Sequence, residues 1–549
     1  MATPAAAQVR ALDNGVEVTR GGMAVRVTAL SASVLRVRMA RDGQWPEDAS
    51  WAVPAEVRTR STKVRARGDG FDTDALTVKV EPLPPCVSPS SCRSRLPVGE
   101  RYFGLGDKTG PFDRRGASYV HWNTDTFGYG RETDPTYKSI PFYVTTGGGF
   151  GSYGLFLDNP TRSWFDFGHR SDGKLKIGAP DGPVDYYLIA RADAVGGGPA
   201  LSRPDRHGAA DRAVGLGYQQ SRYSYMSDTE VRDLAARLRK ERIPTDVIWL
   251  DIDFQDRNRP FTTNPKTFPD LPRLARDLKS DGIRAGGDHR PAYRARAEPG
   301  HAPFDSGAAG NHFLRTAKGA PMSRRYGRGF GIPRFHPGSV ARVVGRAVQG
   351  LRARGNRRLL ERHERAGDLR DAEQDDAARH RPPHRGRRLL QRVRRAMPKS
   401  TMSMACRTAA RRFEGLKKLD PAARPFVMTR ATYAGVSATR SWSSRPVGLF
   451  RTAPRISRVH GGPSPELLTR WMQIGAFTPV MRVHAAVNTP RSEPWVDGPE
   501  HLALRRAAIE ERYRLFPYLY AVAEQQARSG DPIMRPSSTT MPRRAAIRR

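Results

Sequence analysis

Two carboxylates separated by one residue, Asp251 and Asp253, stand at the end of the apolar stretch DVIWLDIDF. A charged group beside a buried strand is costly unless it has a partner. Enzymes built on parallel β-barrels place their binding and catalytic groups at the carboxyl ends of the strands. The alternative is a strand end that is exposed to water. The spacing therefore makes these carboxylates candidates for binding a polar substrate.

A second group of polar and aromatic residues lies in WNTDTFGYGRETDPTYKSIPFYV, which contains Asp125. Carboxylates and amides beside aromatic rings are typical of sugar-binding sites, but this composition alone does not identify a ligand. Gly104, Gly106 and Gly110 of GLGDKTG lack the Gly-Lys-Ser/Thr element of a phosphate-binding loop, so this segment predicts a turn. His484 in MRVHAA, taken by itself, favours a structural role.

Alternating apolar and polar residues dominate the first part of the chain. The stretch from Met23 to Met39, MAVRVTALSASVLRVRM, has the period of two that is typical of half-buried antiparallel strands. ALTVKVE repeats this pattern, PVDYYLIA is a further strand, and turns rich in Gly and Pro recur between them. We predict an N-terminal β-sandwich domain over residues 1–213.

After Ala213 the pattern changes to strand, helix, strand. VGLGYQQ is a short apolar strand, and SDTEVRDLAARLRKERI begins with a capping box formed by Ser227 and Glu230. DVIWLDIDF is typical of a strand buried on both faces. This order predicts a βα-barrel or a doubly wound sheet. A third buried strand is required after the helix LPRLARDLKSDGI, but RAGGDHRPAY carries two glycines and several charges, so the pattern breaks there.

The pattern resumes near Phe413. RPFVMTRATYAG is an apolar strand that runs into a loop, and a long helix, EHLALRRAAIEERYRLFPYLYAVAEQQA, is predicted to kink at Pro517. We assign residues 214–530 to this second domain and regard its segments 283–412 and 436–459 as degraded. We predict that residues 531–549 form a truncated tail.

The positive charge of the chain is concentrated in one window. The net charge is +38, and residues 283–412 contain 31 Lys plus Arg against 10 Asp plus Glu. A basic nucleic-acid-binding protein is one interpretation of such a charge. Single-strand binding generally also uses aromatic stacking, and the segment from Pro337 to Arg412 has no aromatic residue. We therefore expect no nucleic-acid partner.

Other compositional features exclude several classes of protein. Three cysteines, Cys86, Cys92 and Cys406, are too few for a disulfide framework, and Cys86 and Cys92 lack the further ligands of a zinc site. The N-terminus has no signal pattern, and no apolar run approaches membrane-spanning length. We expect a cytoplasmic protein with no metal, no cofactor and no membrane partner. The oligomeric state stays open.

Several segments together resemble glycoside hydrolase family 31, the retaining α-glucosidases. They occur in family order and cover about half of the chain: RYFGLGDKTGPFDRRG, WNTDTFGYGRETDPTYKSIPF, GLGYQQSRYSYMSDTEV, DVIWLDIDFQDRNRPFTTNPKTFPD, NHFLRTAKGAP, RPFVMTRATYAG, SPELLTRWMQIGAFTPVMRVH and ERYRLFPYLYA. The resemblance implies a galactose-mutarotase-like β-sandwich followed by a (β/α)8 barrel, here incomplete. It also implies hydrolysis of terminal α-linked glucose from an oligosaccharide or α-glucoside; an α-xyloside is the alternative substrate.

The resemblance also implies roles in sugar binding for six residues. The charged and polar members would hydrogen-bond sugar hydroxyls, and the other two would pack against the ring. The first group is Asp125, Asp251, Arg430 and His484, and the second is Tyr223 and Ile252.

The family's two catalytic motifs do not occur in this sequence. A retaining glycosidase needs a nucleophile and an acid/base roughly 5–5.5 Å apart. In the family, the nucleophile follows the fourth strand in a Trp-Asn-Asp-Met-Asn-Glu-Pro motif. The acid/base lies in a Trp-x-Gly-Asp-Asn motif, which would belong after Gly435, where the chain is shorter than the family spacing. The catalytic residues of this chain are therefore unknown.

A shift of reading frame accounts for the missing nucleophile. The segment from Arg358 to Gly367 can be encoded so that a shift of one nucleotide yields GFWNDMNEP, whose aspartate codon straddles Arg362 and His363. The same shift converts IPRFHP, GGDHRP and EQDDAARHRPPH into other segments that look like the family. We therefore expect an inactive chain in which Ile332–Arg412 is poorly ordered, or helical without an apolar face. A non-catalytic sugar-binding remnant is the alternative function.

Overall fold

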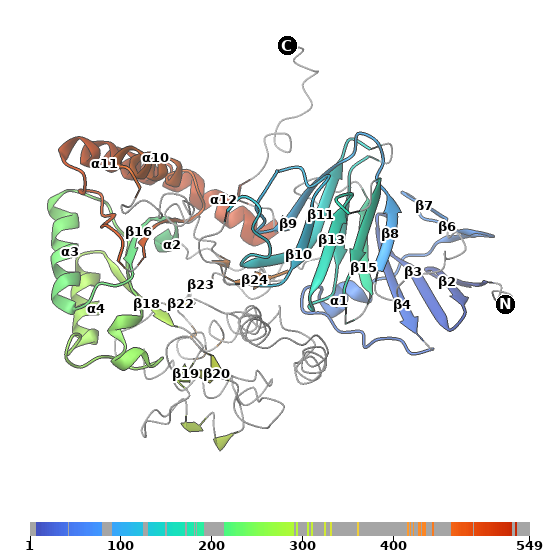
Figure 1. The fold of residues 1–549 in the computed structure, drawn as a ribbon, viewed down its shortest axis with the longest axis horizontal. Helices are drawn as coiled ribbons and strands as arrows, with labels where there is room; N and C mark the ends of the chain where they lie inside the picture. The colour runs from blue at the N-terminus through green and yellow to red at the C-terminus, as the bar shows by residue number, and fades with distance from the viewer. Residues whose placement is uncertain are drawn as a thin grey trace, which may run out of the picture.

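The computed structural model describes residues 7–41, 43–79, 91–124, 130–148, 151–170, 173–180, 182, 184–190, 213–289, 293–294, 305–306, 309–310, 323–324, 330–331, 359–361, 414, 416, 418, 421, 426–429, 431–434, 442–443, 463–486, 488–529 and 533–534. Within these residues an N-terminal part made of β-sheets stands beside a part with parallel strands and helices (Figure 1).

The N-terminal part is a β-sandwich, as the alternating pattern predicts. Its larger sheet has the order β1 (Gln8–Leu12), β2 (Gly15–Arg20), β3 (Met23–Ser31), β4 (Val34–Arg41), β15 (Asp185–Ala190), β12 (Tyr153–Leu157), β11 (Lys138–Thr146) and β24 (Thr432–Tyr433), with β9 (Arg101–Gly106) also paired to β11. The smaller sheet consists of β10 (Ser118–His121), β13 (Ser163–Phe167), β14 (Lys174–Gly178) and β8 (Ser91–Arg95). A helix, α1 (Ala55–Arg58), and a small sheet of β5 (Arg65–Arg67), β6 (Gly70–Asp72) and β7 (Thr77–Lys79) accompany them.

A buried carboxyl group, Asp158, follows strand β12 of the sandwich. It is 5% exposed and lies near Asp185, which forms an ion pair with Arg36. Burial, together with the negative charge of Asp185, raises the pKa of Asp158 to about 7. The group is therefore protonated in the folded protein at pH values where it is ionised in the unfolded chain.

The Asp158→Asn variant is expected to depend less on pH than the wild type. Because the folded-state pKa is raised, the favourable contribution of Asp158 is complete below about pH 4 and is lost as the pH rises through about 7. Asparagine does not ionise, so the free energy of unfolding of the variant, relative to that of the wild type, should be about 1–3 kcal/mol higher at pH 8 than at pH 5. Urea unfolding at both pH values measures this difference. The exposed Asp74→Asn change is the control, and an equal pH dependence in wild type and Asp158→Asn would contradict the prediction.

The second part is built on a seven-stranded parallel sheet. Its order is β25 (Trp442–Ser443), β23 (Val427–Thr429), β22 (Leu359–Glu361), β18 (Arg284–His289), β17 (Val247–Leu250), β16 (Tyr218–Arg222) and β26 (Met481–Ala485). Its α-helices within the described residues include α2 (Ala213–Leu216), α3 (Asp228–Lys240), α4 (Leu271–Ser280), α10 (Pro465–Gly475), α11 (Pro499–Arg514) and α12 (Phe516–Ser529). Among the residues that the structure describes, β25 and β26 do not pair, so the barrel is not closed there.

Helix α3 shows why the local sequence folds as it does. The Ser227 hydroxyl caps the helix by accepting a hydrogen bond from the Glu230 backbone N–H at 3.1 Å. The Glu230 carboxylate accepts from the backbone N–H of Met226 at 2.7 Å, one residue before the cap. The predicted apolar face is confirmed, since Val231, Leu234, Ala235 and Leu238 are all buried against the sheet. The predicted break near Pro517 separates α11 from α12.

The expected break in the third strand is wrong. RAGGDH forms strand β18, which pairs in parallel with β17 on one side and β22 on the other. Its glycine at position 286 leaves room for the indole ring of Trp249, because a Cβ atom at Gly286 would lie 2.3 Å from Cε3 of that ring. Trp249 is 1% exposed, so the neighbouring strand supplies the apolar bulk that β18 lacks.

The Gly286→Ala variant is expected to lose about 1–3 kcal/mol in free energy of unfolding, because overpacking forces the Trp249 ring or a strand to move. Chemical denaturation of the whole chain measures the change. Gly68→Ala is the matched control, since nothing lies within 4 Å of its added Cβ. Equal stability of the Gly286→Ala variant and the wild type would show that the third strand is not packed in this way.

Part of the segment expected to be poorly ordered, or helical without an apolar face, is a strand. Leu359–Glu361 forms β22 between β18 and β23, so the expectation for these three residues is wrong. The rest of Ile332–Arg412, including Arg362 and His363, lies outside the described residues. In the other window expected to be degraded, 436–459, the structure describes Trp442–Ser443, which is β25.

A short strand joins the two parts of the molecule. Thr432–Tyr433, which follows the barrel strand β23 closely in the chain, forms β24 and pairs in parallel with β11 of the sandwich. The Tyr433 side chain is fully buried against Trp51, Ala52 and Trp122 of the sandwich. Figure 1 shows β24 beneath the sandwich strands, on the side that faces the parallel sheet. The chain after β23 is thus packed against the start of the loop that follows β10.

Candidate functional site

Three neighbouring strands, β17, β16 and β26, bring polar groups together at their carboxyl ends. They pair in parallel, with β16 in the middle. Asp251 directly follows β17 and is 2% exposed. Its carboxylate accepts a hydrogen bond from the backbone N–H of Ile252 at 2.9 Å and thereby caps the short 3-10 turn Ile252–Phe254. The turn at the strand end therefore fixes the direction of this carboxylate.

His484 of β26 lies close to this carboxylate. The distance between Nε2 of His484 and Oδ2 of Asp251 is 3.9 Å, and His484 is 5% exposed. This distance is too long for a direct hydrogen bond, but both atoms are within reach of one hydroxyl oxygen of a ligand placed beside them. The structure thus brings together two residues that were predicted as sugar ligands from distant parts of the sequence.

Two further polar residues support His484. Ser221 of β16 lies opposite His484 in the strand register, and its Oγ is 2.8 Å from Nδ1 of the imidazole. One guanidinium nitrogen of Arg482 donates to Ser221 Oγ at 3.1 Å and lies 3.3 Å from the same Nδ1. Ser221 and Arg482 are 1% and 4% exposed. Neither residue was predicted, although an arginine between Met481 and Val483 in MRVHA was a usable signal, and the structure shows this strand to be buried along its whole length.

The remaining predicted residues divide into two groups. Tyr223 follows β16, is half-buried, and donates its backbone N–H to the carbonyl of Ala485 at 2.9 Å, so it lies at the same end of the sheet. Ile252 is buried in the turn after Asp251. Asp125, Arg430 and Gly435 lie outside the described residues, so their placement stays a prediction.

The two carboxylates of DVIWLDIDF have different surroundings. Oδ2 of Asp253 accepts a hydrogen bond from the Ser224 hydroxyl at 2.5 Å, and Asp253 is only half-buried. Asp251 is buried beside His484. The first carboxylate therefore belongs to the candidate site, whereas the second holds the loop after β16 in place.

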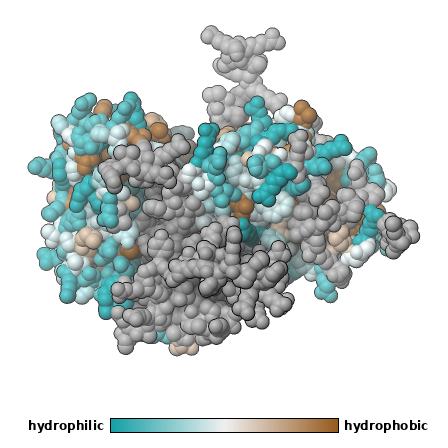
Figure 2. All heavy atoms as spheres, viewed as in Figure 1, coloured by the Kyte–Doolittle hydropathy of each residue, from teal (hydrophilic) through white to brown (hydrophobic). Residues whose placement is uncertain are grey.

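The described part of the chain offers little for a metal or a membrane. It contains no group of three or more His, Cys, Asp or Glu side chains that could hold a metal ion. Within the same ranges, no helix is both long and apolar enough to cross a membrane. In Figure 2 the visible described surface is mostly hydrophilic, with scattered apolar residues and no broad apolar patch.

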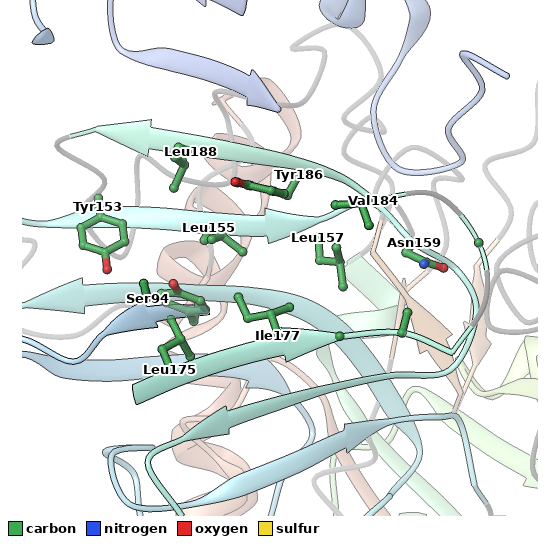
Figure 3. A pocket seen from close by; sticks show the side chains of 14 residues that line it. Ser94, Tyr153, Leu155, Leu157, Asn159, Leu175, Ile177, Val184, Tyr186 and Leu188 are labelled. Carbon is green, nitrogen blue, oxygen red and sulfur yellow. The ribbon is translucent and has the colours of Figure 1, made fainter. Parts of the chain in front are cut away.

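A cavity of about 260 Å³ lies in the sandwich, away from the carboxylate site. Its walls are mainly apolar and include Leu155, Leu175, Ile177 and Leu188 (Figure 3). Strand β8 places Ser94 opposite Leu175, where a larger apolar side chain would fill the space. The cavity thus lies among apolar side chains of the sandwich, beside the short side chain of Ser94.

Comparison with known proteins gives matches over both parts of the chain. A family model described as the glycosyl hydrolases family 31 TIM-barrel domain matches residues 212–444 and 441–522. A second, described as the glycosyl hydrolase 31 N-terminal galactose mutarotase-like domain, matches residues 86–166. The two parts occur in the predicted order of sandwich and barrel.

Individual relatives agree with these matches. Alpha-glucosidase 2 of Bacillus thermoamyloliquefaciens is 29% identical over 485 residues, which cover 81% of this chain and 58% of the relative. Human neutral alpha-glucosidase AB is 26% identical over 489 residues, or 77% of this chain and 48% of the relative. The chain thus spans about half the length of these relatives. A Flavobacterium johnsoniae family 31 dextranase in complex with glucose has the same fold, with a TM-score of 0.77, 24% identity, and coverage of 97% of this chain and 71% of that one.

Proposed function

Because the chain belongs to glycosyl hydrolase family 31, we propose that its barrel binds the terminal glucose of an α-glucoside at the carboxyl ends of β16, β17 and β26. The observation that carries this proposal is the buried pair of Asp251 and His484, whose facing atoms are 3.9 Å apart. Curated relatives named as alpha-glucosidases support the choice of an α-glucoside.

The geometry of the pair suits a sugar hydroxyl. A hydroxyl oxygen about 2.8 Å from both facing atoms could accept a hydrogen bond from the imidazole and donate one to the carboxylate. Neither side chain needs to move far, because the turn holds Asp251 and Ser221 holds His484. Asp125, Tyr223, Ile252 and Arg430 would complete the site, with the first and last hydrogen-bonding the sugar and the other two packing against its ring.

Hydrolysis requires catalytic groups in addition to the residues that bind the sugar. The retaining mechanism needs a nucleophile and an acid/base on opposite sides of the bond that is cleaved. Asp251 would bind a hydroxyl in this arrangement, and Asp253 accepts from Ser224. We propose that the nucleophile is displaced by a frame slip at Arg362 and His363, that the acid/base loop after Gly435 is lost, and that the chain as written is a sugar-binding remnant without catalysis.

Calorimetric titration of the whole chain with D-glucose tests the binding proposal. We expect saturable binding at one site, and no release of 4-nitrophenol from 4-nitrophenyl α-D-glucopyranoside under the same conditions. A chain that binds no glucose, but binds a mixed-sequence oligonucleotide with a steep dependence on salt, would instead support the nucleic-acid interpretation.

A further inference from the structure

The support behind His484 has a definite order of hydrogen-bond donors and acceptors. Arg482 and His484 are two positions apart on β26, so their side chains emerge on the same face of the sheet. Ser221 reaches the same face from the paired strand β16, and the three polar groups form a closed triangle with contacts of 2.8, 3.1 and 3.3 Å.

The guanidinium group determines this order. It has only N–H donors and no acceptor, so Ser221 Oγ and His484 Nδ1 can each hydrogen-bond to it only through a lone pair. The serine hydroxyl can accept from Arg482 and still direct its own hydrogen to Nδ1. A neutral imidazole carries one proton, which must then be on Nε2.

We propose that Arg482 and Ser221 are positioning residues that hold His484 as the neutral tautomer with its proton on Nε2, directed at Asp251. The proposal rests on the proposed sugar site. This tautomer places a donor, His484 Nε2, next to an acceptor, Asp251 Oδ2, where one sugar hydroxyl would bind. A group that both accepts and donates would be selected, and an analogue that lacks this hydroxyl would lose one hydrogen bond to the imidazole and one to the carboxylate.

The tautomer can be measured without any sugar. The whole chain is labelled with ¹⁵N-histidine, and long-range ¹H–¹⁵N spectra are recorded at pH 8, with the His484→Asn variant identifying the signals of His484 among the 13 histidines. We expect an unprotonated Nδ1 and a protonated Nε2. Signals of the opposite tautomer in the wild type would overturn the proposal, whatever happens in the variants.

Variants separate positioning from a merely structural role. The charged side chains that face His484 in the described part of the structure are Arg482, from its own strand, and Asp251, from the end of β17. In Arg482→Met, protonation of Nδ1 is no longer opposed, so the titration midpoint of His484 should rise by about one pH unit or more. Arg482→Lys keeps a cationic donor and should stay near the wild-type midpoint. An unchanged midpoint in Arg482→Met, with the fold intact by circular dichroism, would overturn the proposal.

Glucose binding by the variants is measured separately. If the wild type binds glucose, Arg482→Met should bind it at pH 8 at least about tenfold more weakly than Arg482→Lys, because a neutral imidazole that carries its proton on Nδ1 has no donor at Nε2. Equal affinities of the two variants would overturn the positioning role. If the wild type binds no glucose, the proposed function fails, while the spectra of His484 still decide whether Arg482 and Ser221 set its tautomer.

Discussion

Restoring the reading frame from Arg284 to Arg412, with the loop after Gly435 rebuilt, is expected to turn an inactive chain into an α-glucosidase. The unrepaired chain should release no 4-nitrophenol from 4-nitrophenyl α-D-glucopyranoside above the uncatalysed rate. Loss of the nucleophile and the acid/base removes covalent catalysis and leaving-group protonation together, and such groups act as a unit. We therefore expect the repaired enzyme to be faster by roughly 10⁴–10⁶-fold.

The position of β22 gives this expectation a structural basis. Leu359–Glu361 occupies the place next to β18 in the parallel sheet, and its carboxyl end lies at the edge where barrel enzymes place catalytic groups. In the restored frame the nucleophilic aspartate arises at the boundary of the codons for Arg362 and His363. It therefore follows the strand immediately.

Replacing the restored aspartate by alanine is the control for this experiment. It should abolish the recovered activity and leave glucose binding in place, because binding is assigned to other residues. Activity in the unrepaired chain would show that the nucleophile has been misidentified. A repaired chain that folds, binds glucose and remains inactive would contradict the frame-slip account.

The Asp251→Ala variant is expected to bind D-glucose roughly 10- to 150-fold more weakly than the wild type. A hydrogen bond to a charged acceptor contributes about 1.5–3 kcal/mol, and the buried imidazole of His484 would lose the neighbour that shares its ligand. Calorimetric titration measures the dissociation constant, and thermal unfolding checks that the variant is folded.

Asp253→Ala is the matched control for that variant. It makes the same chemical change two residues later, at a carboxylate that accepts from Ser224. Its affinity for glucose should stay within about twofold of the wild type, since weak effects of this size correspond to less than 0.5 kcal/mol. Equal weakening by both changes would mean that the loop, and not the carboxylate of Asp251, is responsible.

Local patterns in the sequence were sufficient to predict the helices and strands whose buried positions recur at a regular spacing. The capping box at Ser227 and the apolar face of α3 depend on residues three or four positions apart, so both could be predicted and both are confirmed. The sandwich strands could be predicted for the same reason, because apolar and polar residues alternate along a strand that has one buried face. The end of DVIWL marked Asp251 as costly to bury, and the structure buries it beside His484.

Strand β18 shows where this reasoning fails. Two glycines and flanking charges are unfavourable in an isolated strand, and they predicted a break. The tertiary structure overrides that preference, because Trp249 of β17 fills the space above Gly286 and the strand gains hydrogen-bonded neighbours on both sides. The free-energy cost of a residue in a sheet depends on the side chains and hydrogen bonds that the neighbouring strand provides. These cannot be seen in the residue's own segment of sequence.

The sequence by itself determined the family, the order of sandwich and barrel, and the strand end that carries the first carboxylate. Only the tertiary structure decided which side chains lie next to that carboxylate. Ser221 and His484 are 263 positions apart, and they meet because β16 and β26 pair in parallel with one particular register. A shift of β26 by one residue would turn His484 to the other face of the sheet, away from Ser221. Arg482 shares a face of the sheet with His484 because the two residues are two positions apart on β26, and the register with β16 brings its guanidinium within 3.1 Å of Ser221 Oγ.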